Sequence, residues 1–303
     1  MTLTRTRGSV VESFGRRVAV VLDNGRRVDS KLRGRKLDVV VGDAVELEGD
    51  DATSDWAVVE RSPRRNLFTR SSSQGSEEPL VANLDQLGVV VAPLPACDPF
   101  IVDRYFAGAR YAGIACLLVV NKCDLARSDE DVSVLVGYRS ADVPVLEVSA
   151  RSGQGMDALR LLLTGRRTLL AGQSGVGKST LFNELSGGAF RATRTLSTAT
   201  HEGRHTTVSS AIVTCPWGEL VDSPGVRDYA PPLVPLRDVQ RGYAEIEAVA
   251  SGCRFQDCLH AREPQCAVRA AVDAARMDNR RYESYRRLLN LTRQLAERRG
   301  HRG

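Results

Sequence analysis

The chain has 303 residues, a formal net charge of +5 and a hydrophobic content of 42%, which suits a folded protein of one to three domains. No apolar run reaches the length of a membrane span, and residues 1–14 lack the apolar core of a secretory signal, so we expect a cytoplasmic protein without membrane association. The seven cysteines are an odd number, which argues against a disulfide framework.

Residues 1–70 are predicted to form a small all-β barrel. Four β-rich runs (GSVVESFG, RRVAVVLDNG, GRKLDVVVGDAVELEGD and DWAVVERS) are broken by Gly, Asn and Asp, and Asp23-Asn24-Gly25 is typical of a hairpin turn. Several short strands in under seventy residues favour an OB-like barrel, although a barrel without any ligand is the alternative. The polar segment 70–79, RSSSQGSEEP, is predicted to be a linker or mobile loop.

Residues 71–230 alternate apolar strands with helical stretches, which predicts a central α/β domain. The strands are nearly continuous runs of Val and Leu, as expected for a largely parallel sheet that is buried on both faces. Helices are predicted over residues 98–113, 155–163 and 179–187, and strands over residues 86–92, 114–121, 143–150, 167–172, 211–214 and 219–222.

Residues 231–303 are predicted to form a mainly α third domain. They begin with several prolines, continue through a cysteine cluster and end in a helix, because Tyr285, Leu288, Leu289 and Leu295 recur at helical spacing. Residues 271–303 hold nine Arg against four acidic residues. This excess indicates either a solvated helix face or a surface suited to a phosphate backbone.

The second domain contains a phosphate-binding loop. Residues 172–180, GQSGVGKST, match G-x-x-x-x-G-K-[ST] between a predicted strand and a predicted helix. The glycines let backbone N–H groups surround the phosphates, the Lys reaches the β- and γ-phosphates, and the Ser hydroxyl binds Mg²⁺. The predicted nucleotide contacts are Gly172, Gln173, Ser174, Gly175, Val176, Gly177, Lys178, Ser179 and Thr180, with Ser179 as a magnesium ligand.

A guanine-binding motif precedes this loop. The tetrapeptide NKCD, residues 121–124, follows a predicted strand, and its Asp can accept hydrogen bonds from the N1–H and the exocyclic amine of guanine, a donor pair that adenine lacks. Because this motif comes before the phosphate loop, the order indicates a circular permutation. A P-loop ATPase or kinase is the alternative. The predicted base contacts are Asn121, Lys122, Cys123 and Asp124, with Ser149 and Ala150 further along the chain.

The tetrapeptide DSPG, residues 222–225, supplies a third motif, D-x-x-G, after a predicted strand. Asp222 is predicted to hold Mg²⁺ through water, and the Gly225 N–H to contact the γ-phosphate. Many GTPases carry a water-orienting Gln after this Gly, but the residue here is Val226, which cannot orient water.

The segment GRHTT, residues 203–207, is predicted to be the first switch loop. His205 would position the attacking water, and Thr206 would complete the magnesium shell, with Thr207 as the alternative. An exposed loop histidine without a catalytic role is the alternative for His205.

The cysteine cluster has the composition of a zinc site. Three sulfurs and one imidazole lie within fourteen residues, which suits a tetrahedral structural Zn²⁺ with no open position for water. Few apolar residues lie nearby in the sequence, so the metal is predicted to take the place of a hydrophobic core. Redox cysteines or a chance cluster are the alternatives. The predicted ligands are Cys253, Cys258, His260 and Cys266.

The order of these motifs resembles the circularly permuted ribosome small subunit-dependent GTPase A family (RsgA, also called YjeQ) over nearly the whole chain. NLDQLGVVVAPLPACDPFIVDRYFAGA and GCRFQDCLHAREPQCAV are similar to the family as well. The resemblance implies an OB-fold RNA-binding domain at 1–70, a permuted GTPase domain at 71–230 and a zinc domain at 231–303, with His205 as the switch histidine and the four residues above as zinc ligands. Residues 227–246 depart from the family in lacking its acidic and aromatic residues.

The resemblance also implies a function. Family members hydrolyse GTP slowly alone and faster on the small ribosomal subunit, act late in its maturation, and contact its rRNA near the decoding region. We therefore expect GTP with Mg²⁺ and one structural Zn²⁺ as cofactors, the small subunit and its rRNA as partners, and a monomer. A nucleotide-gated RNA-binding factor in which hydrolysis is incidental is the alternative.

Overall fold

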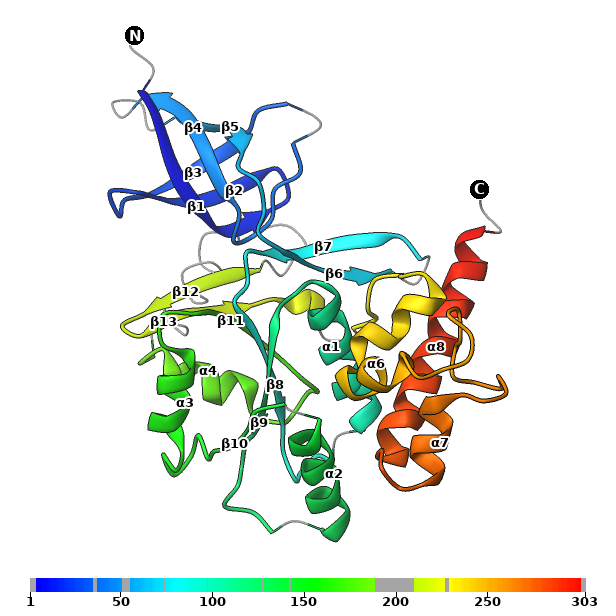
Figure 1. Cartoon of the computed structure of the whole chain (residues 1–303). Coiled ribbons are helices and arrows are strands. Elements are labelled where there is room, and N and C mark those ends of the chain that lie inside the picture. Colours follow the sequence, from blue (N-terminus) through cyan, green and yellow to red (C-terminus); the bar gives the residue numbers. More distant parts are fainter. Residues whose placement is uncertain are drawn as a thin grey trace.

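The computed structural model describes residues 4–34, 37–50, 55–72, 75–96, 98–126, 128–141, 143–188, 210–226 and 229–300. A small β-barrel lies next to a two-stranded hairpin, followed by a central α/β region and a helical region that ends in a long helix (Figure 1). The predicted fold class is therefore confirmed. Within the described ranges, no helix is long and apolar enough to cross a membrane.

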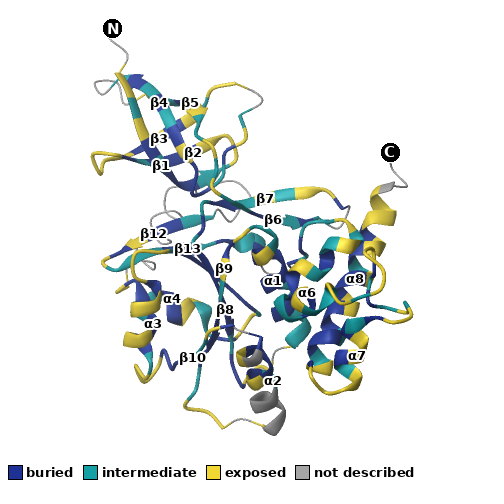
Figure 2. Ribbon diagram, in the orientation of Figure 1, coloured by how far each residue is buried: buried dark blue, intermediate teal, exposed yellow. Residues whose placement is uncertain are grey.

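Five strands close the barrel: β1 (Thr4–Phe14), β2 (Arg17–Leu22), β3 (Arg27–Leu32), β4 (Ala44–Asp50) and β5 (Asp55–Arg61). They follow one another in the order β1-β2-β3-β5-β4, and β4 pairs again with β1. Buried and exposed residues alternate along the barrel strands (Figure 2). In the interior, Trp56 packs among Val and Leu side chains. Closure leaves the barrel without a free sheet edge.

Two details of the barrel differ from the sequence prediction. The hydrophobic pattern does not predict β3, because Asp29 and Lys31 occupy its outward face. Where the structure describes the β-rich run 34–50, it contains one strand, β4, and Val41 forms an isolated bridge to Val81. The predicted hairpin turn at residues 23–25 is confirmed between β2 and β3.

The prediction of a linker or mobile loop at residues 70–79 is wrong at both ends of this segment, which lie in strands. Strands β6 (Leu67–Ser71) and β7 (Glu77–Ala82) pair antiparallel as a hairpin. Phe68, Val81 and Ala82 are fully buried, and the exposed residues among those described in the hairpin are Ser76, Glu77 and Pro79. Ser71 also forms a hydrogen bond outside the hairpin, because its N–H donates to the Ala230 carbonyl at 2.9 Å. Hydrogen bonds to a distant segment thus give a polar stretch a fixed extended structure.

Among the described residues, the central part of the large sheet contains β8 (Gln86–Val91), β9 (Ala115–Val120), β10 (Val145–Glu147), β11 (Arg167–Ala171), β12 (Ala211–Cys215) and β13 (Gly218–Asp222). Their order is β10-β9-β8-β11-β13-β12, and only β12 is antiparallel to its neighbour β13. All the predicted strands are confirmed. The chain reverses its winding direction between β8 and β11, and sheets of this type bind ligands at the carboxyl edge of that point.

Helices cover both faces of this sheet. Helices α1 (Pro99–Tyr111) and α2 (Asp129–Ser140) pack on one face, and α3 (Met156–Leu163) and α4 (Lys178–Leu185) pack on the other. The predictions of α1, α3 and α4 are confirmed. The pattern does not predict α2, because its valines alternate as they do in a strand.

The C-terminal region consists of the 3-10 helix η2 (Leu236–Gly242) and helices α6 (Ala244–Ala250), α7 (Ala267–Asp273) and α8 (Asn279–Gly300). Tyr243, Ile246, Tyr285 and Leu288 lie in its buried core beside the cysteine cluster. The prediction that a metal takes the place of a core is therefore wrong. The core residues come from elements distant in the sequence, which local composition does not reveal.

A buried ion-pair network attaches this region to the central domain. Asp103 of α1 is fully buried, and its two carboxylate oxygens accept hydrogen bonds from Arg280 (3.0 Å) and Arg281 of α8. Arg281 also contacts Glu245 of α6 at 2.6 Å. Buried charges require such partners, so the network fixes α8 against α1.

Candidate nucleotide site and candidate metal centre

The phosphate loop connects β11 to α4 at the carboxyl edge of the sheet. Gly172, Gly175 and Gly177 have positive φ angles, which side chains rarely tolerate. A Cβ at Gly177 would also lie 2.4 Å from Nδ2 of Asn121. The Lys178 ammonium donates to two carbonyls of the loop at 2.6 and 2.7 Å. The loop therefore has the curvature and the central cation that phosphate binding requires.

The remaining predicted loop residues differ in exposure. Val176 is fully buried beneath the loop, whereas Ser174, Ser179 and Thr180 are exposed and Gln173 is half-buried. Helix α4 begins at Lys178, so Ser179 lies in its first turn, where the free N–H groups and the helix dipole favour an anion.

Asn121 joins three of the predicted motifs. Its side chain is 2% exposed, its amide donates to the Val176 carbonyl at 2.9 Å, and its oxygen accepts from the Ala150 N–H at 3.1 Å. One buried amide therefore holds the end of β9, the phosphate loop and the segment after β10 together. The structure places these sequence-predicted residues in one site.

Lys122 makes a second connection to the phosphate loop. Its φ angle is +59°, and its ammonium donates to the carbonyls of Gly175 (2.9 Å) and Leu94 (2.7 Å). These two hydrogen bonds hold the aliphatic part of the Lys122 side chain extended from the base motif to the phosphate loop. A bound base would lie along this aliphatic part. Leu94 belongs to the β8–α1 connection, which the sequence motifs do not predict as part of the site.

Asp124 is exposed beside the buried Ser149. A hydrogen bond from the Ser149 side chain is the main cause of a lowered pKa of the Asp124 carboxyl, with backbone N–H donation and nearby cations assisting. The carboxylate is therefore ionised at neutral pH, as an acceptor of two guanine hydrogen bonds must be. The half-buried Cys123 completes the turn, and its N–H donates to the Val148 carbonyl at 3.0 Å.

The third motif lies on a neighbouring strand. Strand β13 pairs in parallel with β11 and ends at Asp222, so Asp222 reaches the same sheet edge as the phosphate loop. Gly225 follows in a short 3-10 helix, η1 (Pro224–Val226). The side chain of Ser210 donates to that of Ser223 at 2.8 Å, which ties the start of β12 to the motif.

The predicted first switch loop lies outside the described residues. His205, Thr206 and Thr207 fall within 189–209, so the roles assigned to them stay predictions.

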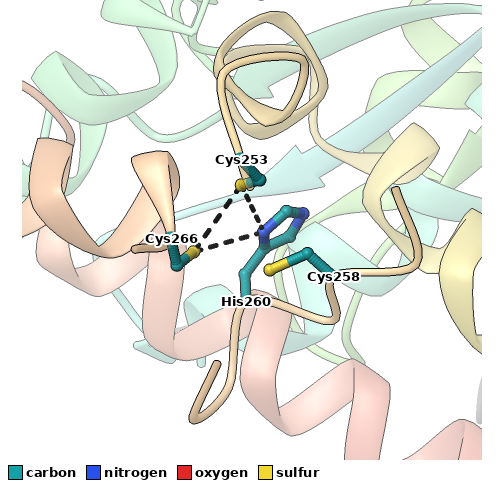
Figure 3. A group of neighbouring side chains, drawn as sticks. All are labelled: Cys253, Cys258, His260 and Cys266. Atoms are coloured by element: carbon teal, nitrogen blue, oxygen red, sulfur yellow. Dashed lines mark hydrogen bonds between the residues drawn. The ribbon is translucent and has the colours of Figure 1, made fainter. Parts of the chain in front are cut away.

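The cysteine cluster converges on one point (Figure 3). The three sulfurs and one imidazole nitrogen lie within 4.8 Å of one another. The Cys253 and Cys266 sulfurs are 3.8 Å apart, and the His260 Nδ1 lies 3.5 and 3.4 Å from them. A tetrahedral zinc ion with ordinary bond lengths separates its ligand atoms by about 3.5 to 3.8 Å. The geometry therefore fits zinc.

Burial shifts the pKa values of the cluster toward the uncharged forms of its side chains. Burial, and then the neighbouring cysteines, raise the pKa of the Cys258 thiol to about 12, and burial raises that of Cys266. Burial lowers the pKa of His260, which keeps its imidazole neutral. Thiolates would therefore form here only with a positive ion to balance them, as in a structural metal site.

Other elements orient the ligand loop. The Gln240 side-chain oxygen lies 2.7 Å from His260 Nε2, so the imidazole proton sits on Nε2 and the Nδ1 lone pair faces the sulfurs. From α8, the Tyr282 hydroxyl donates to the His260 carbonyl at 2.7 Å. The Glu263 carboxylate accepts from three backbone N–H groups of the loop. Metal-ligand spacing in the sequence gives no sign of these supporting residues.

Residues 61–231 match the family model described as RsgA GTPase. The chain belongs to the RsgA GTPase family. Two curated relatives named small ribosomal subunit biogenesis GTPase RsgA, from Azotobacter vinelandii and Pseudomonas aeruginosa, are each 37% identical to it. The alignments span 290 and 286 residues, and each covers 93% of this chain and 84% of the relative.

Solved structures extend the comparison to the whole RsgA-type fold. The crystal structure of YjeQ from Thermotoga maritima matches with a TM-score of 0.77 and 29% identity, over 95% of this chain and 99% of that chain. YloQ, described as a circularly permuted GTPase, matches with a TM-score of 0.73 and 22% identity over 96% of each chain, and at that identity it shows the fold alone. The permuted arrangement of the central domain is thus confirmed.

Proposed function

We propose that this protein is a GTPase of small ribosomal subunit maturation that binds rRNA and is stimulated by the subunit. The observation that supports this most is the buried Asn121 side chain, which joins the base motif, the phosphate loop and the segment at Ala150. The relative from Azotobacter vinelandii, named small ribosomal subunit biogenesis GTPase RsgA, aligns with this chain over 84% of its own length. GTP and GDP are the expected ligands. The three predicted domains, 1–70, 71–230 and 231–303, would act together on the subunit.

Each predicted site residue has a role in this proposal. Asp124 would accept from guanine, and Lys178 would contact the β- and γ-phosphates. Mg²⁺, which would neutralise charge on the phosphates, would be held by Ser179, Asp222 and Thr206 or Thr207. Gly225 would donate its N–H to the γ-phosphate. The Cys₃His cluster would hold one structural zinc ion.

His205 would position the water that attacks the γ-phosphate, since Val226 has no polar side chain with which to do so. Catalysis would then rest mainly on position and charge, with an in-line water and a neutralised phosphate. Loss of the γ-phosphate would release the segment after Gly225 and change how residues 231–303 meet the RNA.

The variant His205→Ala tests the catalytic part of the proposal. Loss of a water-positioning group is expected to reduce subunit-stimulated turnover by roughly 100-fold. Affinity for GDP should not change, because His205 would not contact the diphosphate. The matched control is His201→Ala, a histidine four residues earlier in the sequence and outside the predicted switch loop, which should leave turnover unchanged. Undiminished stimulated turnover in His205→Ala would remove the assigned role.

A further inference from the structure

Strand β6 runs along the segment that follows the third nucleotide motif. The Ser71 N–H donates to the Ala230 carbonyl at 2.9 Å, and the Ser71 hydroxyl donates to the Pro231 carbonyl at 2.9 Å. The Thr69 carbonyl accepts from the Tyr229 hydroxyl, also at 2.9 Å. These three hydrogen bonds attach residues 229–231 to strand β6 of the hairpin.

Arg70 reaches from the same strand to the motif itself. Its Nη1 donates to the Gly225 carbonyl at 2.8 Å, and its Nε donates to Glu78 of β7, also at 2.8 Å. Glu78 thereby fixes the direction of the guanidinium, whose planar fork suits two acceptors at once. The Arg70 side chain is 32% exposed, so the contact is partly shielded from water.

The hairpin also touches Gly225 sterically. A Cβ built on Gly225 would lie 2.7 Å from Cδ2 of Leu80 on β7. The glycine thus lies against an apolar side chain and accepts a charged hydrogen bond through its carbonyl. These independent contacts define the position of Gly225 from the hairpin side.

Helix α1 supports the segment from the opposite side. The Tyr105 hydroxyl donates to the Val226 carbonyl, and the Tyr229 ring stacks between Phe68 of β6 and Tyr105 at centroid distances of 4.9 and 5.0 Å. Such aromatic contacts are rigid and fully buried here. The peptide at Gly225 is therefore enclosed by fixed groups, and Arg70 is the charged one among the contacts described.

The hairpin contacts other regions at both of its ends. At its base, the Ala82 N–H donates to the Val41 carbonyl of the barrel at 2.9 Å. At its tip, Gly75 lies against Leu295 and Arg299 of α8, since an added Cβ would meet them at 3.0 and 3.3 Å. Figure 1 shows β6 and β7 between the barrel and the central domain, extending toward α8. One element thus contacts the barrel, the third motif and the C-terminal helix.

We propose that Arg70 is a positioning residue for the third nucleotide motif, and that the β6–β7 hairpin transmits the conformation of Gly225 to the barrel and α8. The inference rests on the proposed function, in which Gly225 donates to the γ-phosphate. GDP lacks that phosphate and would be held by the phosphate loop and the base motif alone. Arg70 should therefore affect affinity for GTP and leave affinity for GDP unchanged.

The test compares binding of GDP and of a non-hydrolysable GTP analogue to the full chain. Arg70→Ala is expected to weaken analogue binding roughly five- to tenfold, the usual effect of losing a charged hydrogen bond in a partly exposed site, with no change for GDP. Amide hydrogen exchange over residues 222–226 should become faster. Arg70→Lys should show a smaller effect, because its ammonium keeps a charged donor, although it cannot contact both acceptors with the fork geometry.

Two further variants control for a merely structural role. Arg65→Ala removes an arginine at the base of the same hairpin, paired with Asp85 at 2.7 Å, and should leave both affinities unchanged. Glu78→Gln keeps Arg70 but removes the charge that holds its guanidinium in place. It should reduce analogue affinity less than Arg70→Ala does. The proposal is overturned if Arg70→Ala leaves the ratio of the two affinities unchanged, whether both affinities stay the same or both fall equally.

The wild-type chain separates this inference from the proposed function. If the wild-type chain binds neither guanine nucleotide, or does not hydrolyse GTP, the proposed function itself fails. If the wild-type chain hydrolyses GTP and prefers the analogue over GDP while Arg70→Ala keeps the same preference, only the role of Arg70 fails.

Discussion

Asn121 shows how one residue organises a site built from segments far apart in the chain. Its amide bonds in two directions, to the phosphate loop and to the segment after β10, so its removal would leave two buried backbone groups unpaired. Lys122 adds a bond to the same loop. The base motif therefore helps to hold the shape of the phosphate loop.

Asp124, the last residue of the same motif, is predicted to select guanine over other bases. Asp124→Asn should reduce GDP affinity roughly 100-fold, because an amide cannot accept from both guanine donors, and should create affinity for xanthosine diphosphate, whose C2 carbonyl can accept from the new amide. Equilibrium binding of both nucleotides measures the change. Asp157→Asn, an exposed acidic residue of α3 paired with Arg160, is the matched control. Retention of the guanine preference in Asp124→Asn would contradict the assignment.

Sequence motifs predict the chemical role of single residues better than the contacts that those residues make with distant segments. The glycines, Lys178 and Asn121 lie where the motif spacing predicts, because a phosphate loop and its base motif dictate local backbone shape. Gln240, Leu94 and Arg70 belong to no motif. Each contacts its site through a pairing distant in the sequence, and one sequence does not reveal such pairings.

At the scale of elements, strands of the barrel and sheet follow from their hydrophobic patterns, whereas polar elements do not. The composition of residues 70–79 predicts a linker or mobile loop, because the segment contains no large apolar side chain that could pack in a core. Strands β6 and β7 nevertheless extend into both ends of this segment, because Phe68 packs against Tyr229 and Ser71 bonds to Ala230. The core beside the cysteine cluster is a similar case, since α6 and α8 supply it.

Metal removal is expected to affect these C-terminal elements unequally. The loop 251–266 would depend on the four proposed ligands, whereas α8 also packs on a hydrophobic core and on Asp103. Structural zinc sites contribute on the order of 10 kcal/mol of binding energy to folding. A strong chelator should therefore raise amide exchange in 251–266 first, while α8 stays protected. Added zinc should restore protection.

GDP binding serves as the control for chelation, because the phosphate loop and base motif lie in a different domain and should keep their affinity. A metal-stripped protein with unchanged exchange in 251–266 would contradict the assignment of the cluster as a structural metal site.

At the scale of the whole molecule, permutation places the third motif at the end of the central domain, directly before the helical region. The chain leaves β13, passes between β6 and α1, and then enters η2. The hairpin that holds this passage also contacts the barrel and α8. A change at Gly225 can therefore reach both flanking regions without a long intervening path.

This arrangement suits the proposed stimulation of GTP hydrolysis by the small ribosomal subunit, because a partner that contacts the barrel or α8 would also contact elements attached to Gly225. The direct measurement is the rate of GTP hydrolysis by the full chain with and without purified small ribosomal subunits. Lys178→Ala provides the background rate, and purified large subunits control for general effects of RNA. We predict at least a roughly tenfold stimulation by small subunits, as expected when a partner completes a GTPase site. The same rate with and without small subunits would contradict the account.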